Sequence, residues 1–270
     1  MNLSTRSKPT EDASGQGNSR DDALSLAVQA LHTPDFFPAM IGLLRRAAPF
    51  TGAFVTTLHP NRAPTHVHDN VRAERRRVVI DDYLESAYLL DPIHDVFLSG
   101  ATDCAVRLRD VAPDHFRRST YYKLYYGNID LRDEMALLIR MPGGSALFYS
   151  LGRIGREPRF TARDLAAFRR QLPLIGSLSR KHFENRPDEP PYGLGQSITQ
   201  ALEQFGTDVL TAREREIAGL ILKGHSSASI GALTGTTTGT VKIHRKNLYR
   251  KLGIGSQSEL LSRFLQSVMR

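Results

Sequence analysis

The sequence predicts an α+β protein of two domains: an N-terminal α/β sandwich, in which helices flank an antiparallel sheet, and a C-terminal all-α domain of four helices. Three observations predict this. Residues 21–184 mix strand-like and helix-like stretches and include a Pro-Gly-Gly hairpin signal. Proline and glycine cluster at 185–195, which is typical of a linker. Two capping boxes, opened by Thr211 and Ser256, lie in the remaining segment.

Composition limits the class of protein. The chain has 270 residues, 40% hydrophobic and 24% charged, as in ordinary globular proteins. A single cysteine, Cys104, excludes an intramolecular disulfide. The N-terminal stretch lacks the apolar core of a signal peptide, and no apolar run approaches the roughly 20 residues that span a bilayer. We therefore expect a cytoplasmic protein without a membrane partner.

The chain divides into four expected segments. Residues 1–20 are polar and predict a disordered tail. Residues 21–184 form the expected sensor or dimerisation domain, residues 185–206 the linker, with a short helix near 196–205, and residues 207–270 the helical domain.

Within residues 21–184, each element has a local signal. Pro34 opens a helix at an early position, and the pair Asp91-Pro92 ends another. Pro142 begins the hairpin turn, and Thr161 with Asp164 can cap the last helix. The expected helices are 23–31, 34–47, 77–90 and 161–183, and the expected strands are 53–58, 65–71, 134–140 and 145–151.

The C-terminal domain has clearer boundaries. Thr211 and Glu214 form a capping box at the start of the first helix, which ends at Gly224. A second short helix begins near Ser227, a third runs from Thr238 to Leu252, and a fourth follows the capping box of Ser256 and Glu259.

The third of these helices has two distinct faces. At 100° per residue, one apolar stripe collects Val241, Leu248 and Leu252. A neighbouring stripe carries Lys242, Arg245, Lys246 and Tyr249. From residue 207 onward there are ten Lys and Arg against four Asp and Glu, so this block holds +6 of the chain's net +8. A solvated basic face is the alternative, but the short helices and tight turn before it favour a helix that enters the major groove of DNA.

These residues resemble the LuxR-type (GerE-like) helix-turn-helix over about a quarter of the chain. The match lies at Leu210, Thr211, Arg213, Glu214, Glu216, Ile217, Gly224, Ser226, Ile230, Thr240, Val241, Lys242, His244, Asn247, Lys251, Leu252 and Gly253. The family usually has alanine where Gly231 stands.

The resemblance implies the roles of individual residues and the partners. Lys242, Ile243 and Lys246 would approach bases, and the phosphate contacts would be Thr237, Thr240, Asn247 and Arg250. The fourth helix would pair two such domains through Leu260, Leu261, Phe264, Leu265 and Val268. The implied partners are a two-fold-related double-stranded operator and a second copy of the chain. A small-molecule effector and RNA polymerase are further candidate partners.

The N-terminal domain also resembles LuxR-type regulators. Tyr83, Tyr88 and Asp91-Pro92 are similar to a run in the autoinducer-binding domains, which implies a sandwich of the PAS, GAF or autoinducer-domain kind. Further stretches, Arg107–Asp114, Tyr121–Tyr126 and Asp133-Glu134, resemble a broad group of these regulators.

Candidate ligand contacts follow from this resemblance and from aromatic spacing. They are Phe54, Tyr83, Tyr88, Asp91, Tyr122 and Tyr126. At helical spacing either Tyr122 and Tyr126, or Tyr121 and Tyr125, share a face, and such aromatics are more often core than ligand cage. Asp91 is equally suited to cap a helix or to hold a cationic or amide-bearing ligand.

Other functions lack their signatures. The sequence has no phosphoacceptor arrangement of a receiver domain, no Gly-rich phosphate loop and no nucleophile elbow. His66 and His68 would share a strand face, but too few ligands lie nearby for a metal site. We expect no catalytic residue, metal or cofactor. The expected function is a sequence-specific DNA-binding regulator, a dimer controlled by a small molecule; the alternative is a ligand-independent regulator whose N-terminal domain dimerises or docks a protein.

Overall fold

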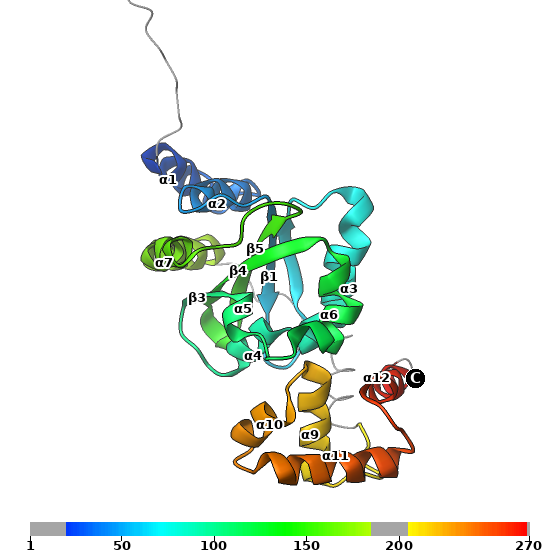
Figure 1. The fold of residues 1–270 in the computed structure, drawn as a ribbon. Helices are drawn as coiled ribbons and strands as arrows, with labels where there is room; N and C mark the ends of the chain where they lie inside the picture. The colour runs from blue at the N-terminus through cyan, green and yellow to red at the C-terminus, as the bar shows by residue number, and fades with distance from the viewer. Residues whose placement is uncertain (1–19, 185–204, 269–270) are drawn as a thin grey trace, which may run out of the picture.

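The computed structural model describes residues 20–184 and 205–268, with side chains as far as Phe264. An antiparallel sheet with helices on both faces forms one body, and four helices, α9 to α12, form the other (Figure 1). This confirms the α+β class. No helix in the described residues is long and apolar enough to cross a membrane. The expected tail and most of the expected linker, with its short helix, lie outside the described residues.

The sheet has five strands in the order β2-β1-β5-β4-β3, and the paired strands are antiparallel. The hairpin between β4 and β5 turns through Gly143 and Gly144, whose φ angles of 75° and 80° are the conformation that glycine adopts at no steric cost. The strands are β1 Gly52–Leu58, β2 Thr65–Asp69, β3 Cys104–Arg107, β4 Leu131–Arg140 and β5 Ala146–Ile154.

Alternate residues of each strand face opposite sides of the sheet. Apolar residues on both sides are buried by helices, so each face has its own core. Three helices pack on one face: α1 Arg20–Gln29, α2 Phe36–Arg45 and α7 Ala162–Phe183. Short helices cover the other face and its edge: α3 Asp82–Glu85, α4 Pro92–Leu98, α5 Leu108–Val111 and α6 Thr120–Leu124. The second face contains the cavity described below.

The helix expected over 77–90 is wrong as a single element. A wide turn at Arg77–Asp81 leads into α3, and a 3-10 turn covers Ala87–Leu90. Between them Ser86 leaves the helical region, with φ −159°. Tyr83, Tyr88 and Leu90 are all buried. A straight helix would place Tyr88 about 140° away from Tyr83 around its circumference, so the break lets Tyr88 turn inward as well.

The two histidines of β2 do not share a face as expected. A bulge opposite Val55 and Thr56 shifts the register between His66 and His68. His66 then stacks on Phe54, and His68 stacks on Phe37 of the opposite core. Among the described residues, no group of three or more His, Cys, Asp or Glu could hold a metal ion.

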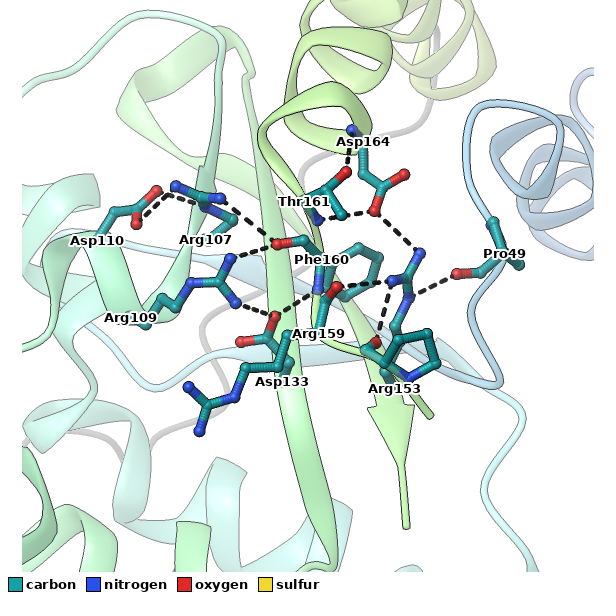
Figure 2. A network of polar contacts seen from close by, with 11 residues as sticks. Pro49, Arg107, Arg109, Asp110, Asp133, Arg153, Arg159, Phe160, Thr161 and Asp164 are labelled. Atoms are coloured by element: carbon teal, nitrogen blue, oxygen red, sulfur yellow. Dashed lines mark hydrogen bonds and ion pairs between the residues drawn. The ribbon is translucent and has the colours of Figure 1, made fainter. Parts of the chain in front are cut away.

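A polar network fixes the start of α7 to the sheet (Figure 2). Arg153 of β5 is 4% exposed and lies over the Phe160 ring. Its guanidinium donates to the carbonyl oxygens of Pro49, Pro158 and Arg159 and to the carboxylate of Asp164. Asp164 in turn forms the capping box of α7 with Thr161, so one buried cation holds the β5–α7 connection together.

The neighbouring carboxylate in Figure 2 joins this network to α5. Asp133 accepts hydrogen bonds from Arg109 at 2.6 Å and from the Phe160 backbone N–H at 2.7 Å. Arg107 pairs with Asp110. The arginines and aspartates of the motifs Arg107–Asp114 and Asp133-Glu134 therefore stabilise the fold through these contacts.

The C-terminal helices begin and end where their caps predict. They are α9 Ala212–Lys223, α10 Ser227–Leu233, α11 Thr238–Leu252 and α12 Gln257–Val268. Thr211 and Glu214 form the expected capping box, and Gly224 and Gly253 end α9 and α11 in the left-handed region. The buried Glu214 carboxylate also accepts a 2.7 Å hydrogen bond from Lys251, so a single side chain caps α9 and binds the end of α11.

The two bodies touch along α9. Lys223 at the end of α9 pairs with Asp95 of α4, and the backbone N–H of Ser226 donates to Asp114 at 3.0 Å. Gly224 approaches Ser119 so closely that a side chain at residue 224 would clash. The helices that cover the cavity face therefore also contact the C-terminal domain.

Candidate DNA-binding surface and N-terminal cavity

Helix α11 is fixed by its apolar stripe. Val241, Leu248 and Leu252 are buried, as the periodicity predicts, and pack in the core that α11 shares with α9 and α10. The turn before it is tight: the Thr236 backbone N–H donates to the Gly231 carbonyl, and a Cβ at residue 231 would lie 2.8 Å from the Thr236 oxygen. This contact explains why glycine stands where the family usually has alanine.

The opposite side of α11 is open to solvent. Lys242, Lys246 and Arg250 are exposed. Ile243 is 62% exposed, which is unusual for a large aliphatic side chain and places a hydrophobic group between cations. The helix contains no acidic residue. This surface can therefore offer positive charge to phosphates and both polar and apolar groups to base edges.

The first turn of α11 adds backbone donors. Thr237 caps the helix by accepting from the Thr240 N–H at 3.1 Å, and the two hydroxyls are 2.9 Å apart. The remaining N–H groups of the first turn have no partner within the helix and favour an anion. Thr237 is exposed and Thr240 is partly exposed, so both can lie beside a phosphate.

Two other candidate residues are less free. The Arg245 guanidinium donates to the Ser227 hydroxyl at 3.2 Å and to the Tyr249 hydroxyl at 3.3 Å. It is therefore held between α10 and α11. Asn247 is half-buried and accepts from Arg250 at 3.4 Å.

The burial of two residues of the fourth helix, α12, corrects part of the expected dimer surface. Leu260 and Phe264 are 0% and 2% exposed, because they face the core of their own domain, where Phe264 packs against Phe205. They attach α12 to α9 rather than form an open stripe. Leu261 is half-buried, and the side chains of Leu265 and Val268 lie outside the described residues.

The N-terminal domain contains a cavity of about 500 Å³ at one end of the sheet. Its walls are mainly apolar and include Phe54, Val71, Val79, Ile129 and Leu131. Its mouth has mixed charge, because two cations and two carboxylates lie there: Arg72, Arg75, Asp130 and Glu157. A volume of this size is typical of small-molecule sites.

A second cavity of about 20 Å³ adjoins the first. The two share lining residues, among them Phe54, Tyr125 and Ser150. The small cavity is also lined by Tyr83, Tyr121 and Glu134. We call this small space the inner chamber.

Two buried carboxylates lie at or near the inner chamber. Glu134 is 3% exposed and accepts one hydrogen bond, from the Ser150 hydroxyl at 2.5 Å. Asp91 accepts from the Tyr83 hydroxyl at 2.9 Å and from the Ile93 N–H at 2.8 Å. Burial raises the pKa of both carboxyl groups, and the negative charge of Asp91 raises the pKa of Glu134 further.

The structure separates the sequence-predicted ligand residues. Phe54 and Tyr83 line the inner chamber. Asp91 accepts from Tyr83 and caps α4, which is the first of the two roles considered for it, and it lines neither cavity. Tyr88 is buried against His94 and does not line either cavity.

The structure places the pair Tyr121 and Tyr125, rather than Tyr122 and Tyr126, at the inner chamber. Tyr122 and Tyr126 pack around Phe116, away from the chamber, whereas Tyr121 and Tyr125 line it. Helical spacing gave two equivalent pairs, and only the packing of α6 on the sheet distinguishes them.

Glu134 and Ser150 were missed, although a signal existed. Glu134 has the same strand parity as Ala136 and Leu138, so a carboxylate lies on a strand face that is otherwise apolar.

Comparisons with known proteins agree with this geometry. The family model described as bacterial regulatory proteins, luxR family, matches residues 208–264. An HTH-type transcriptional regulator described from the exeN 3' region of Aeromonas salmonicida is 33% identical over 159 residues, which cover 55% of this chain and 80% of that protein. The chain belongs to the LuxR family.

Other matches extend into the N-terminal domain of this LuxR protein. The monoamine regulon transcriptional regulator of Klebsiella aerogenes is 25% identical over 181 residues, covering 67% of this chain and 70% of its own. The crystal structure of the VqsR LBD domain from Pseudomonas aeruginosa covers 63% of this chain and 100% of its own, with 23% identity and a TM-score of 0.55. That structure shows that the N-terminal fold is shared.

Proposed function

We propose that this LuxR-type transcriptional regulator binds a two-fold-related DNA operator as a homodimer through α11, and that a small molecule in the N-terminal cavity controls its DNA affinity. The observation that supports the first part is the acid-free exposed face of α11 with Lys242, Ile243 and Lys246. The observation that supports the second is the cavity of about 500 Å³.

A direct structural connection links the cavity to the DNA-binding domain. Tyr83 lines the inner chamber and donates to Asp91, which is the N-cap of α4. The same short helix carries Asp95, the partner of Lys223 at the end of α9. A ligand that displaces Tyr83 would therefore act on α4, and through it on the contact with the DNA-binding domain.

The names of two relatives are consistent with this proposal. The Klebsiella aerogenes protein is named as the regulator of a monoamine regulon, and the Aeromonas salmonicida protein as an HTH-type transcriptional regulator. Control by a small molecule is tested by measuring the affinity of the full chain for a selected duplex with and without compounds that raise its thermal stability. Compounds that stabilise the protein but leave its DNA affinity unchanged would contradict control through this cavity.

Ile243 gives a test of base contact. We expect Ile243→Ser to lower the affinity for the selected operator while the free energy of unfolding changes by no more than about 0.5 kcal/mol, because the side chain is already exposed. Binding to duplexes with each base pair varied should show a relaxed preference at one position. Leu26→Ser, a similarly exposed residue on α1, is the matched control and should change neither.

The contact between the domains gives a second prediction. A double-mutant cycle of Asp95→Asn and Lys223→Met should show a coupling of about 0.5–1 kcal/mol in unfolding, the range for partly exposed ion pairs. We also expect either variant to weaken the effect of a stabilising compound on DNA binding, while the affinity without the compound is retained. Coupling of zero would mean that the contact does not join the domains in solution.

A further inference from the structure

The inner chamber presents acceptors and almost no free donors. The Tyr83 hydroxyl donates to Asp91, and Tyr121 lowers the pKa of that carboxyl group. Tyr125 donates to the Val79 carbonyl at 2.7 Å. The fourth hydroxyl, that of Ser150, donates to Glu134. Three of the four hydroxyl protons are therefore already used, and the lone pairs of these hydroxyls can only accept.

Glu134 has unused acceptor capacity. Its side chain is 3% exposed, and the structure gives its carboxylate a single hydrogen bond, so the second oxygen has no partner among the described residues. The residues that line the inner chamber include no lysine, arginine or histidine. Burial without a cation raises the pKa of Glu134 and so favours its neutral form. A positively charged group that entered the chamber would stabilise the carboxylate form and pair with it.

The two cavities together define the shape of such a group. A water-sized group needs roughly 10–15 Å³, and the inner chamber offers about 20 Å³. The adjoining cavity of about 500 Å³ is mainly apolar. The space therefore suits a compact head with several hydrogen-bond donors attached to an apolar body.

We propose that the inner chamber binds the ammonium group of a small organic amine, with Glu134 as its counter-ion and the tyrosine and serine oxygens as further acceptors, while the apolar body of the amine occupies the larger cavity. The inference rests on the proposed function, because it names the chemical class of the controlling ligand. An ammonium group has three donors and no acceptor, which matches what the chamber offers. A carboxylate or phosphate head would instead meet Glu134 without a donor to receive it.

The test also distinguishes two other possible occupants of the inner chamber. An inorganic cation would satisfy Glu134 but leave the larger cavity unfilled. A neutral head such as an alcohol could donate to Glu134 but would bring no charge to compensate an ionised carboxylate. Both can be compared directly with an amine of the same length.

The experiment uses the full chain and three matched probes: hexylammonium, hexan-1-ol and hexanoate, with 2-phenylethylammonium and 2-phenylethanol as an aromatic pair. Titration calorimetry and thermal unfolding are measured for each, and potassium chloride is titrated alone. We expect each ammonium probe to bind at least tenfold more tightly than its alcohol, and hexanoate not to bind. Hydrogen bonds to a charged partner support a difference of this size.

Two variants test whether the preference for ammonium over alcohol arises at the inner chamber. Glu134→Gln, which keeps the size and the capacity to accept from Ser150, should remove the preference for ammonium over alcohol. Asp130→Asn removes a carboxylate at the cavity mouth, at a residue with φ 54° that asparagine tolerates, and should leave the preference intact. Thermal unfolding without probe shows whether each variant is folded. If Glu134→Gln does not fold, Ser150→Ala is used as the second variant of the inner chamber.

The outcomes separate this inference from the proposed function. If the alcohol or hexanoate binds and changes the DNA affinity while the ammonium probes do not bind, the proposal of an amine ligand is wrong. Control of DNA binding by a small molecule would still hold. Potassium alone that reproduces the stabilisation also overturns it. If an ammonium probe binds through Glu134 but leaves the DNA affinity unchanged, the ammonium site is supported and the proposed control of DNA binding is contradicted. Binding of none of the probes overturns the inference.

Discussion

Replacing Arg153 with methionine should lower the free energy of unfolding by about 3–5 kcal/mol, the loss expected when one member of a buried charged network is removed. Its guanidinium donates to three backbone carbonyls and to Asp164, and it is 4% exposed. Methionine can fill part of the volume but offers no donor, so these acceptors would be left without their present partner.

Urea unfolding followed by tyrosine fluorescence measures this effect in the N-terminal domain. The chain has no tryptophan, and seven of its nine tyrosines lie between Tyr83 and Tyr149. Arg156→Met, at an exposed arginine in the same connection, should change the free energy by no more than about 0.5 kcal/mol. Equal, small losses in the two variants would show that the network in Figure 2 does not hold the β5–α7 connection.

Lys246→Ala should weaken specific DNA binding by about 1–3 kcal/mol, which is roughly 5- to 150-fold, if the ammonium group reads a base edge. The side chain is exposed on the cationic face of α11, and its helix is seated by Val241 and Leu248. The loss should be largest on the selected operator, and the preference at one base pair should relax. Affinity measured on single-base-pair variants of the operator gives this result directly.

The matched control is Lys123→Ala, which removes the same charge from an exposed position on α6. It should leave both affinity and base preference unchanged. A uniform loss across all duplexes for Lys246→Ala, with a shallower dependence on salt, would instead assign the lysine to a phosphate. No loss on any duplex would remove Lys246 from the interface.

The C-terminal domain was predictable because its signals are local. The capping box at Thr211, the Ser256 hydroxyl that accepts from the Glu259 N–H, and the glycines at 224 and 253 mark helix ends within a few residues of sequence. The periodicity of α11 places Val241 inward and Lys242 outward without reference to any distant residue. Local periodicity could not show that Leu260 and Phe264 belong to their own domain's core, because an apolar stripe does not identify what covers it.

The cavity was predictable only in part because it depends on contacts far apart in the sequence. Phe54 and Tyr83 come from different elements, and Glu134 and Ser150 meet across two paired strands. Spacing could not choose Tyr121 over Tyr122, nor show that the chain breaks at Ser86. These features are decided by how short helices pack on the sheet.

Selection of duplexes from a randomised library by the full chain at low salt, followed by footprinting, tests the central proposal that the exposed face of α11 lies in a DNA groove. We predict one enriched motif with two half-sites related by a two-fold axis, and its loss when Lys242 and Lys246 are both replaced by alanine. Enrichment of no sequence over competitor, or a motif that survives the double replacement, would contradict it.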